Sequence, residues 1–173
     1  NDTIDIVVNP STNYDVYVQS ICSSGDSSIL AGPLNFVTPC APISSLPYIE
    51  EMSFWPPDCW DLTGGTRTCV HYNGSMAEAS FWGWNTGNAY MTSPTFDVSS
   101  MVSPLLLFDW SHSYSSIYPN DALEVLISDD NGTNWTQVWY KSGTDLESND
   151  GAGNTTPGSF VTSDNINLSS FFL

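Results

Sequence analysis

Residues 105–140 constrain the fold of this chain more than any other stretch. Their sequence is LLLFDWSHSYSSIYPNDALEVLISDDNGTNWTQVWY. Within residues 122–128, Leu123, Val125 and Ile127 alternate with a second set of side chains. That set is Ala122, Glu124, Leu126 and Ser128. A period of two indicates a strand with one buried face. The stretch therefore predicts three strands joined by two turns.

The turn after this strand, residues 128–135, is rich in Asp, Asn and Gly, which tolerate positive φ or bond to their own backbone. It fits the Asp-box pattern S-x-D-x-G-x-T-W, with Asn134 in the place of Thr. An Asp box is a structural turn. We expect Asp130 to accept hydrogen bonds from backbone N–H groups and Trp135 to cover the tip of a β-hairpin.

Beyond the tip, strict alternation places Trp135, Gln137 and Trp139 on one face of the next strand, with Tyr140 on the other. Elsewhere, short strand-like runs recur between turn residues about every 8–12 positions, and no window shows a sustained apolar pattern of helical period. The sequence therefore predicts an all-β fold of the sandwich or jelly-roll kind.

Charge restricts the partners of the chain. Two basic residues, Arg67 and Lys141, stand against 19 acidic ones, for a net charge of −17. Binding to nucleic acid needs clustered Lys and Arg, so this class of partner is excluded, and acidic polysaccharides are disfavoured unless a cation mediates. Acidic, Lys-poor surfaces suit extracellular proteins and calcium sites. No apolar run approaches the roughly 20 residues of a membrane span, so we expect no direct membrane insertion.

The four cysteines, Cys22, Cys40, Cys59 and Cys69, allow three pairings. None forms a C-x-x-C motif, so disulfides in an oxidising compartment are favoured over a zinc or redox site. Cys59 and Cys69 flank Gly64 and Gly65 at a spacing that a hairpin could close. The pairing itself is left open.

The first forty residues resemble part of a known family. The segments NPSTNYDVYVQSIC and GPLNFVTPC are similar to the last strands of a fibronectin type III domain, and residues 4–8 are predicted as a further strand. Pro10, Thr12 and Tyr14 match the tyrosine corner of that family, with Val8 in its Leu position. The resemblance implies that the Tyr14 hydroxyl ties its strand to the preceding turn, and that residues 1–40 are the C-terminal strands of such a domain.

Residues 41–46, with the sequence APISSL, are interpreted as a linker, and residues 47–173 resemble a second family. LPYIEEMSF, MTSPTFDVSS, the central stretch and FVTSDNINLSSF occur in the order seen in MAM-type jelly-roll modules, above all the choice-of-anchor or cleaved-adhesin-like domains of bacteria with type IX secretion. The resemblance implies a partial immunoglobulin-like sandwich followed by a MAM-like jelly-roll β-sandwich that is incomplete at its C-terminus. It also implies an extracellular protein, secreted or attached to the cell surface.

The sequence offers no catalytic set that stands out. His71 and His112 are its only histidines, and no GxSxG, HExxH or Gly-rich phosphate loop is present. Cys69 with His71, or Ser111 with His112, would be the candidate pairs, but histidines of this kind are more often surface or strand residues. Carboxylate pairs are expected by chance among 19 acids. We therefore expect no enzyme.

Acidic residues at the start of the second domain and of its central strand are candidates for a structural calcium site. The resemblance implies that oxygen ligands fix the first segment of the jelly roll to a neighbouring strand. Glu50, Glu51 and Asp121 are the expected ligands, with Asp97 and Asp109 as weaker candidates. Such a metal would couple folding to calcium. The alternative is that these acids are simply solvated.

Aromatic side chains indicate glycan binding, because the C–H faces of sugars stack on exposed rings. Trp82 and Trp84 share one face of a predicted strand, where they are either core residues or a ligand platform. Tyr114 and Tyr118 lie in the polar segment SHSYSSIYPN, where a core role is less natural. These four residues are the candidate ligand-binding set.

Acidity, domain order and missing catalytic motifs together favour a non-catalytic extracellular adhesion or carbohydrate-binding accessory module in a large multidomain protein. Its expected partners are a glycan or a surface protein and the neighbouring domains of the same polypeptide. The alternative is an ancillary region, a spacer or substrate positioner, of a secreted hydrolase such as a metallopeptidase. A spacer with no ligand is a third reading.

Overall fold

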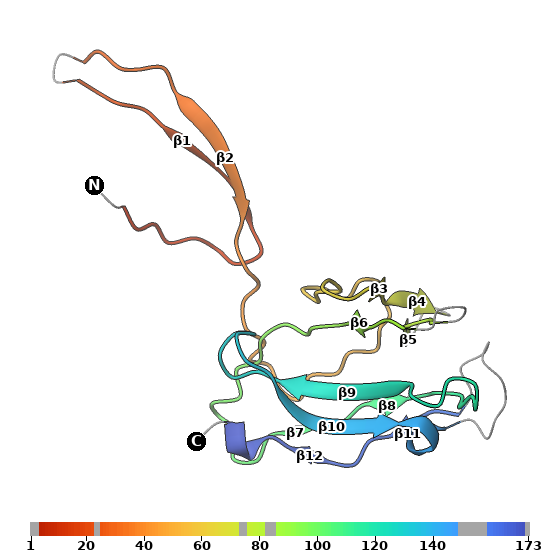
Figure 1. Ribbon diagram of the computed structural model, residues 1–173. Helices are drawn as coiled ribbons and strands as arrows, with labels where there is room; N and C mark the ends of the chain where they lie inside the picture. Colours follow the sequence, from red (N-terminus) through yellow and green to blue (C-terminus); the bar gives the residue numbers. More distant parts are fainter. Residues whose placement is uncertain (1–3, 23–24, 73–75, 82–85, 149–158, 172–173) are drawn as a thin grey trace. The chain divides into compact units, whose positions relative to one another are not determined.

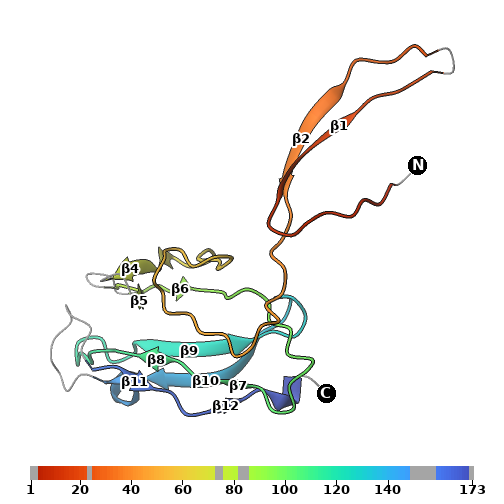
Figure 2. The same cartoon turned by 180° about the vertical axis from the view of Figure 1, so that it is seen from behind.

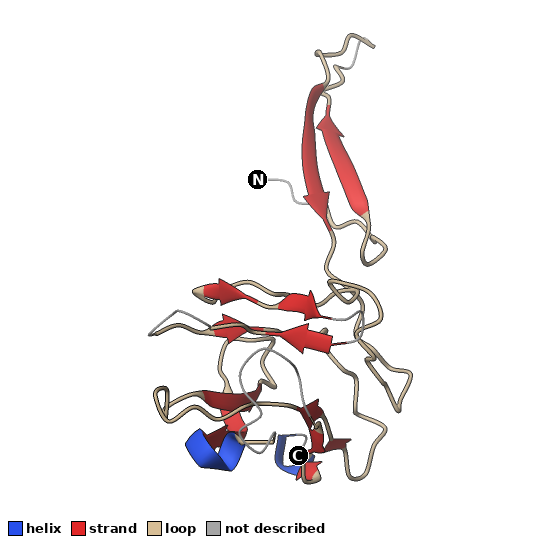
Figure 3. Ribbon diagram, turned by 90° about the vertical axis from the view of Figure 1, so that its right-hand side faces the viewer, coloured by secondary structure: helices blue, strands red, loops and turns tan. Residues whose placement is uncertain are grey.

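A computed structural model gives the structure of the chain (Figure 1). The residues that it describes are 4–22, 25–72, 76–81, 86–148 and 159–171. Strands, turns and loops make up nearly all of them, and the only helical segments described are two short 3-10 helices, η1 (Gly143–Leu146) and η2 (Ser169–Phe171) (Figure 3). The prediction of an all-β fold is confirmed. In this part of the chain, no helix has the length and apolar character that a membrane span requires.

The chain separates into two compact units, residues 1–43 and 44–173. The first contains an antiparallel hairpin of β1 (Asn13–Val18) and β2 (Ala31–Val37). Residues 4–8, predicted as a strand, form none: no described strand pairs with them, and Ile4, Ile6 and Val7 are exposed. An alternating β-branched run becomes a strand only where a neighbour accepts its backbone hydrogen bonds.

Tyr14 closes the turn that precedes β1. The Asn9 N–H donates to the Tyr14 hydroxyl at 2.9 Å, and the Tyr14 ring stacks on Phe36 at a centroid distance of 5.6 Å. The Thr12 N–H donates to the buried Thr38 hydroxyl at 2.9 Å, and that hydroxyl donates to the carbonyl of Asn9 at 2.6 Å. The tie between strand and turn that the tyrosine-corner motif predicts is therefore present.

The second unit contains the remaining strands, which pair two by two (Figures 1 and 2). The pairs are β3 (Arg67–Thr68) with β6 (Ala89–Tyr90), β4 (Val70–Tyr72) with β5 (Met76–Glu78), β7 (Leu105–Leu106) with β12 (Ile166–Asn167), β8 (Asp109–Trp110) with β11 (Val161–Thr162), and β9 (Ala122–Ile127) with β10 (Thr136–Ser142). The β3–β6 pair is parallel and the others are antiparallel. The β9–β10 hairpin, predicted from the alternation in the central stretch, is confirmed.

Ser163 joins the β7–β12 and β8–β11 pairs into one ladder. Its buried hydroxyl accepts the Phe108 N–H at 3.1 Å, and its own N–H donates to the Phe108 carbonyl at 2.8 Å. These two bonds bridge the residues between the paired segments. Residues 105–110 and 161–167 therefore run side by side although about fifty positions separate them in the sequence.

A β-bulge changes which side chains of β10 face inward. The register shifts between Gln137 and Trp139, so that Trp139 pairs with Val125 whereas Tyr140 pairs with Glu124. Paired residues share a face of the sheet. The prediction that Gln137 and Trp139 share a face is therefore wrong, because the extra residue in the bulge inverts the alternation after it.

The inverted alternation turns Trp139 toward the aromatic core of the second unit. Its ring lies 5.0 Å from Phe108 and 5.2 Å from Trp110, both in edge-to-face geometry. Trp110 is 7% exposed, and its indole N–H donates to the carbonyl of the buried Leu146 at 3.3 Å. The Lys141 ammonium lies 4.8 Å from the centre of the Trp110 ring, a cation–π contact. Trp110 and Trp139 are therefore part of this aromatic core.

Among the described cysteines, Cys40 and Cys59 are disulfide-bonded. Cys22 and Cys69 are free thiols. A hairpin closed by Cys59 and Cys69 is therefore not formed. Cys69 is buried beside β6, where its sulfur lies 3.9 Å from the Tyr90 carbonyl, and burial raises the pKa of its thiol.

The tip of the β9–β10 hairpin is a network of hydrogen bonds around Asp130. The Asn134 N–H and the Ser128 hydroxyl each donate to Asp130 Oδ1 at 2.8 Å, and the Asn134 side chain donates to Oδ2 at 2.6 Å. The Trp135 indole N–H donates to the Gly132 carbonyl at 3.0 Å, which holds the ring over the turn. The tip geometry predicted from the Asp-box pattern is confirmed.

These bonds make the stability of the tip depend on pH. Hydrogen bonds from the Asn134 backbone, the Asn134 side chain and Ser128 lower the pKa of Asp130 from 3.8 to about 2. A carboxyl whose pKa is lower in the folded state stabilises fully above its unfolded pKa, and this contribution is lost as the pH falls toward the folded value. We expect the difference in urea midpoint between the wild type and Asp130→Asn to be largest near neutral pH and to shrink between pH 4 and pH 2. Asp129→Asn, which removes the same charge one residue away, is the control. A wild-type advantage that stays constant from pH 7 to pH 2 would contradict this role of Asp130.

Candidate functional site

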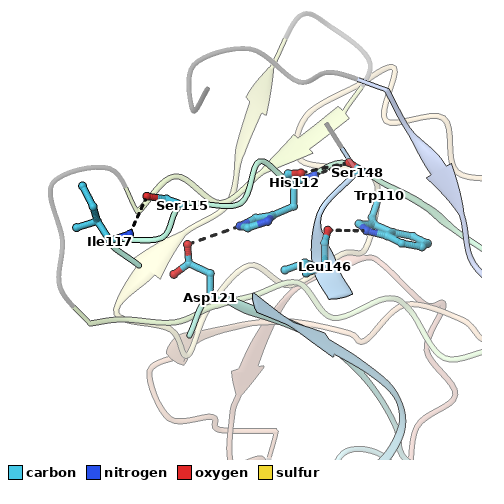
Figure 4. A network of polar contacts seen from close by, with 7 residues as sticks. All are labelled: Trp110, His112, Ser115, Ile117, Asp121, Leu146 and Ser148. Carbon is cyan, nitrogen blue, oxygen red and sulfur yellow. Dashed lines mark hydrogen bonds and ion pairs between the residues drawn. The ribbon is translucent and has the colours of Figure 1, made fainter. Parts of the chain in front are cut away.

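The segment from Ser111 to Asp121, called the 111–121 loop below, connects β8 to β9 and contains the predicted ligand residues Tyr114 and Tyr118. Ser148 fixes its first end (Figure 4). The His112 N–H donates to the Ser148 hydroxyl at 2.8 Å, and the Ser148 N–H donates to the His112 carbonyl at 2.9 Å. The start of the loop is thus fixed to Ser148, which lies two residues after the end of η1.

Gly143, at the start of η1, fixes the other end of the loop. Its N–H donates to the Asp121 carbonyl at 2.9 Å. Its φ is +54°, and a Cβ at this position would lie 2.9 Å from the Pro119 carbonyl oxygen. Glycine is therefore required here both by the left-handed backbone and by the close approach of the loop.

The middle of the loop is a turn around Ser115. The Tyr118 N–H donates to the Ser115 carbonyl at 3.0 Å, and the Ile117 N–H donates to the Ser115 hydroxyl at 3.3 Å. Tyr114 and Tyr118 are half-buried. Within the described residues, neither ring stacks on another aromatic side chain and neither hydroxyl has a hydrogen-bond partner. Each tyrosine therefore offers part of a ring, and a hydroxyl that no described residue engages, from a loop that is held at both ends.

His112 and Asp121 face each other across the loop, with 3.6 Å between Nε2 and Oδ2 (Figure 4). The other ring nitrogen, Nδ1, is buried and has no hydrogen-bond partner in the described part of the chain. A histidine that transfers protons to a substrate needs one nitrogen for its orienting carboxylate and one open to the substrate. Because the second nitrogen is enclosed here, we interpret this pair as a contact that holds the loop closed.

The second histidine is also engaged in structure. The His71 Nε2–H donates to the Met52 carbonyl at 2.7 Å, and the imidazole stacks on Trp55 with 6° between the ring planes. Neither His71 nor His112 thus presents a free nitrogen beside a nucleophile among the described contacts. The predicted pairs Cys69 with His71 and Ser111 with His112 gain no support from this geometry.

The predicted calcium ligands lie in separate surroundings. Glu50 accepts the Tyr48 hydroxyl at 2.7 Å and the Met52 N–H at 2.8 Å, so both of its oxygens are used locally. Burial, followed by the Glu50 hydrogen bond, raises the pKa of Tyr48. Glu51 is exposed, and Asp121 faces His112. Within the described ranges, no three His, Cys, Asp or Glu side chains come together as a metal-binding group. The calcium site stays a prediction.

The weaker calcium candidates, Asp97 and Asp109, accept hydrogen bonds from serine and threonine residues. Asp97 accepts the N–H and the hydroxyl of Ser99, and these bonds lower its pKa. Asp109 accepts the Thr162 hydroxyl at 2.6 Å across the β8–β11 pair. Both carboxylates thus have structural partners, Ser99 for Asp97 and Thr162 on the paired strand for Asp109.

Trp82 and Trp84, the other predicted ligand residues, lie outside the described residues. Conversely, Gly143 and Ser148 position the loop but could not be found from sequence, because nothing in their local sequence marks their pairing with residues far away.

No protein-family model, curated protein or solved structure matches the chain.

Proposed function

We propose that this chain is a non-catalytic extracellular recognition module that binds a glycan or a glycan-bearing surface protein through the 111–121 loop. The observation that carries the proposal is the pair of half-buried tyrosines, Tyr114 and Tyr118, on a loop fixed at both ends, whose hydroxyls have no hydrogen-bond partner among the described residues. The module would act within a large secreted or cell-surface multidomain protein, as the resemblances in the sequence imply.

The physical case rests on preorganisation. A loop held by Ser148 and Gly143 loses little conformational freedom when it binds, so less of the interaction energy is spent on ordering it. Aromatic rings supply apolar contact for sugar C–H faces, and their hydroxyls supply hydrogen bonds. The net charge of −17 favours partners that are uncharged or cationic.

Calcium would support this role as a structural ion. Glu50, Glu51 and Asp121 are its proposed ligands, and Asp121 ends the loop that carries the tyrosines. A cation beside Asp121 would strengthen that end of the loop and make binding sensitive to chelators.

The test is a glycan and matrix-protein array, probed with the chain in calcium and again with a chelator. We expect saturable binding that Tyr118→Ala weakens about tenfold, because loss of a stacked ring costs on the order of 1 kcal/mol. Tyr17→Ala is the matched control, since Tyr17 is a 48% exposed tyrosine on β1, in the first unit. Silence across the array with the fold intact would overturn the proposal and leave a spacer, including the ancillary region of a hydrolase, as the function.

A further inference from the structure

The outer face of the β9–β10 hairpin carries a group of exposed aromatic and polar side chains. Because of the bulge, the pair Gln137 and Leu126 lies on the same face of the hairpin as the pair Tyr140 and Glu124. Trp139 lies on the opposite face, in the aromatic core. Lys141 lies on that same face, with its ammonium above the Trp110 ring. The face that bears Gln137, Tyr140 and Glu124 therefore points away from that core and is called the outer face.

The outer face is open and already organised. Tyr140 is 51% exposed and has no ring or hydrogen-bond partner among the described residues. Beside it, the Gln137 side-chain amide donates to the Glu124 carboxylate at 3.1 Å, and both residues are exposed. At the tip end of the hairpin, Trp135 is 47% exposed and is held by its bond to the Gly132 carbonyl.

Charge and shape indicate which ligand this face suits. The single charged side chain in the group is the carboxylate of Glu124, whereas the neighbouring cation, Lys141, is directed to the other face. An anionic ligand would meet this carboxylate and a chain of net charge −17. A ring with an adjacent amide and carboxylate matches a ligand that has apolar C–H faces and many hydroxyls.

We propose that the outer face of β9–β10 binds an extended, uncharged oligosaccharide. Tyr140 stacks on one sugar ring, Glu124 and Gln137 bond to the hydroxyls of the next, and Trp135 borders the far end. Five positions separate Tyr140 from Trp135, roughly 16 Å at the roughly 3.3 Å rise of a strand, so the face is longer than one sugar ring.

This inference rests on the proposed function and deepens it by naming the class of ligand. The outer face begins where the 111–121 loop ends, because Asp121 directly precedes Ala122, the first residue of β9. The proposed chain of sugars would extend from this end of the loop along the hairpin.

The experiment is isothermal titration of the full chain with five neutral hexasaccharides: cello-, xylo-, manno-, laminari- and maltohexaose. A hyaluronan hexasaccharide is the anionic comparator. We expect at least one neutral hexasaccharide to bind, and the corresponding disaccharide to bind at least tenfold more weakly. Tyr140→Ala should weaken binding about tenfold, and Gln137→Ala severalfold. Tyr17→Ala, which removes an equally exposed tyrosine, should leave the affinity unchanged.

The outcomes separate this inference from the proposed function. Hexasaccharide binding that is lost in Tyr118→Ala but unchanged in Tyr140→Ala and Gln137→Ala would overturn the outer-face site and leave the loop site standing. No binding of any neutral hexasaccharide, or tighter binding of hyaluronan, would overturn the inference directly. Sedimentation equilibrium that shows a dimer broken by Tyr140→Asp would also overturn it, since a second copy would then cover the face.

Discussion

Replacing Trp110 with Ala is expected to lower the free energy of unfolding by about 3–5 kcal/mol. Trp110 is 7% exposed and packs edge to face against Trp139 at 5.2 Å. The substitution removes this contact, leaves a cavity, and strips the hydrogen bond from the Leu146 carbonyl and the ring beneath the Lys141 ammonium. Few buried side chains surround it, so no other part of the core compensates.

Urea denaturation of the full chain, followed by near-UV circular dichroism, measures this effect. Trp110→Phe keeps a ring but removes the N–H, and we expect it to cost about 1–3 kcal/mol. Tyr140→Ala, on the outer face, should change the free energy of unfolding by about 0.5 kcal/mol or less. A Trp110→Ala variant within about 1 kcal/mol of the wild type would show that this aromatic cluster is not the core of the second unit.

Gly143→Ala is expected to destabilise the chain by about 2–3 kcal/mol and to loosen the 111–121 loop. A non-glycine residue at φ +54° costs about 1–2 kcal/mol, and the new methyl group would lie 2.9 Å from the Pro119 carbonyl oxygen. Because this oxygen belongs to the backbone, the clash can be relieved only if the loop moves. That movement stretches the hydrogen bond from the Gly143 N–H to the Asp121 carbonyl.

Gly64→Ala separates the two causes. Gly64 also has a positive φ, +92°, but the nearest atom to its Cβ would be a Tyr90 side-chain carbon at an ordinary 3.6 Å. Its cost should reflect the backbone conformation alone. Equal costs for the two variants in urea denaturation would mean that Pro119 does not press on Gly143.

Features set by a few neighbouring residues were predictable from the sequence. The Asp-box tip forms as expected because Ser128, Asp130 and Asn134 reach one another within seven residues. The Tyr14 tie is likewise confined to five positions. The period of two in β9 indicated a strand because its buried face repeats within one short segment.

Features that depend on a partner strand were not predictable. Alternation in β10 holds only up to the bulge, so the sequence pattern wrongly grouped Gln137 with Trp139 and separated it from Tyr140. Residues 4–8 have strand propensity but no described neighbour to pair with. Pairing of strands is decided by packing across the sheet, which a linear pattern does not contain.

The candidate site shows the same division. Tyr114 and Tyr118 were identified because tyrosines stand out in a polar loop. The residues that hold the loop, Ser148 and Gly143, lie 36 positions from His112 and 22 from Asp121 in the sequence. Only the path of the folded chain through η1 brings them to the loop, so their role cannot be recognised from the sequence.

The most direct test of glycan recognition through the loop and the outer face is a titration followed by NMR. The chain contains eight tyrosines, and labelling their rings with carbon-13 gives each a separate probe. Addition of the neutral hexasaccharide that binds most tightly is predicted to shift the ring signals of Tyr114, Tyr118 and Tyr140, while those of Tyr17 and Tyr90 stay unchanged. Shifts confined to Tyr17 and Tyr90, or no shift with any neutral hexasaccharide, would contradict recognition through these surfaces.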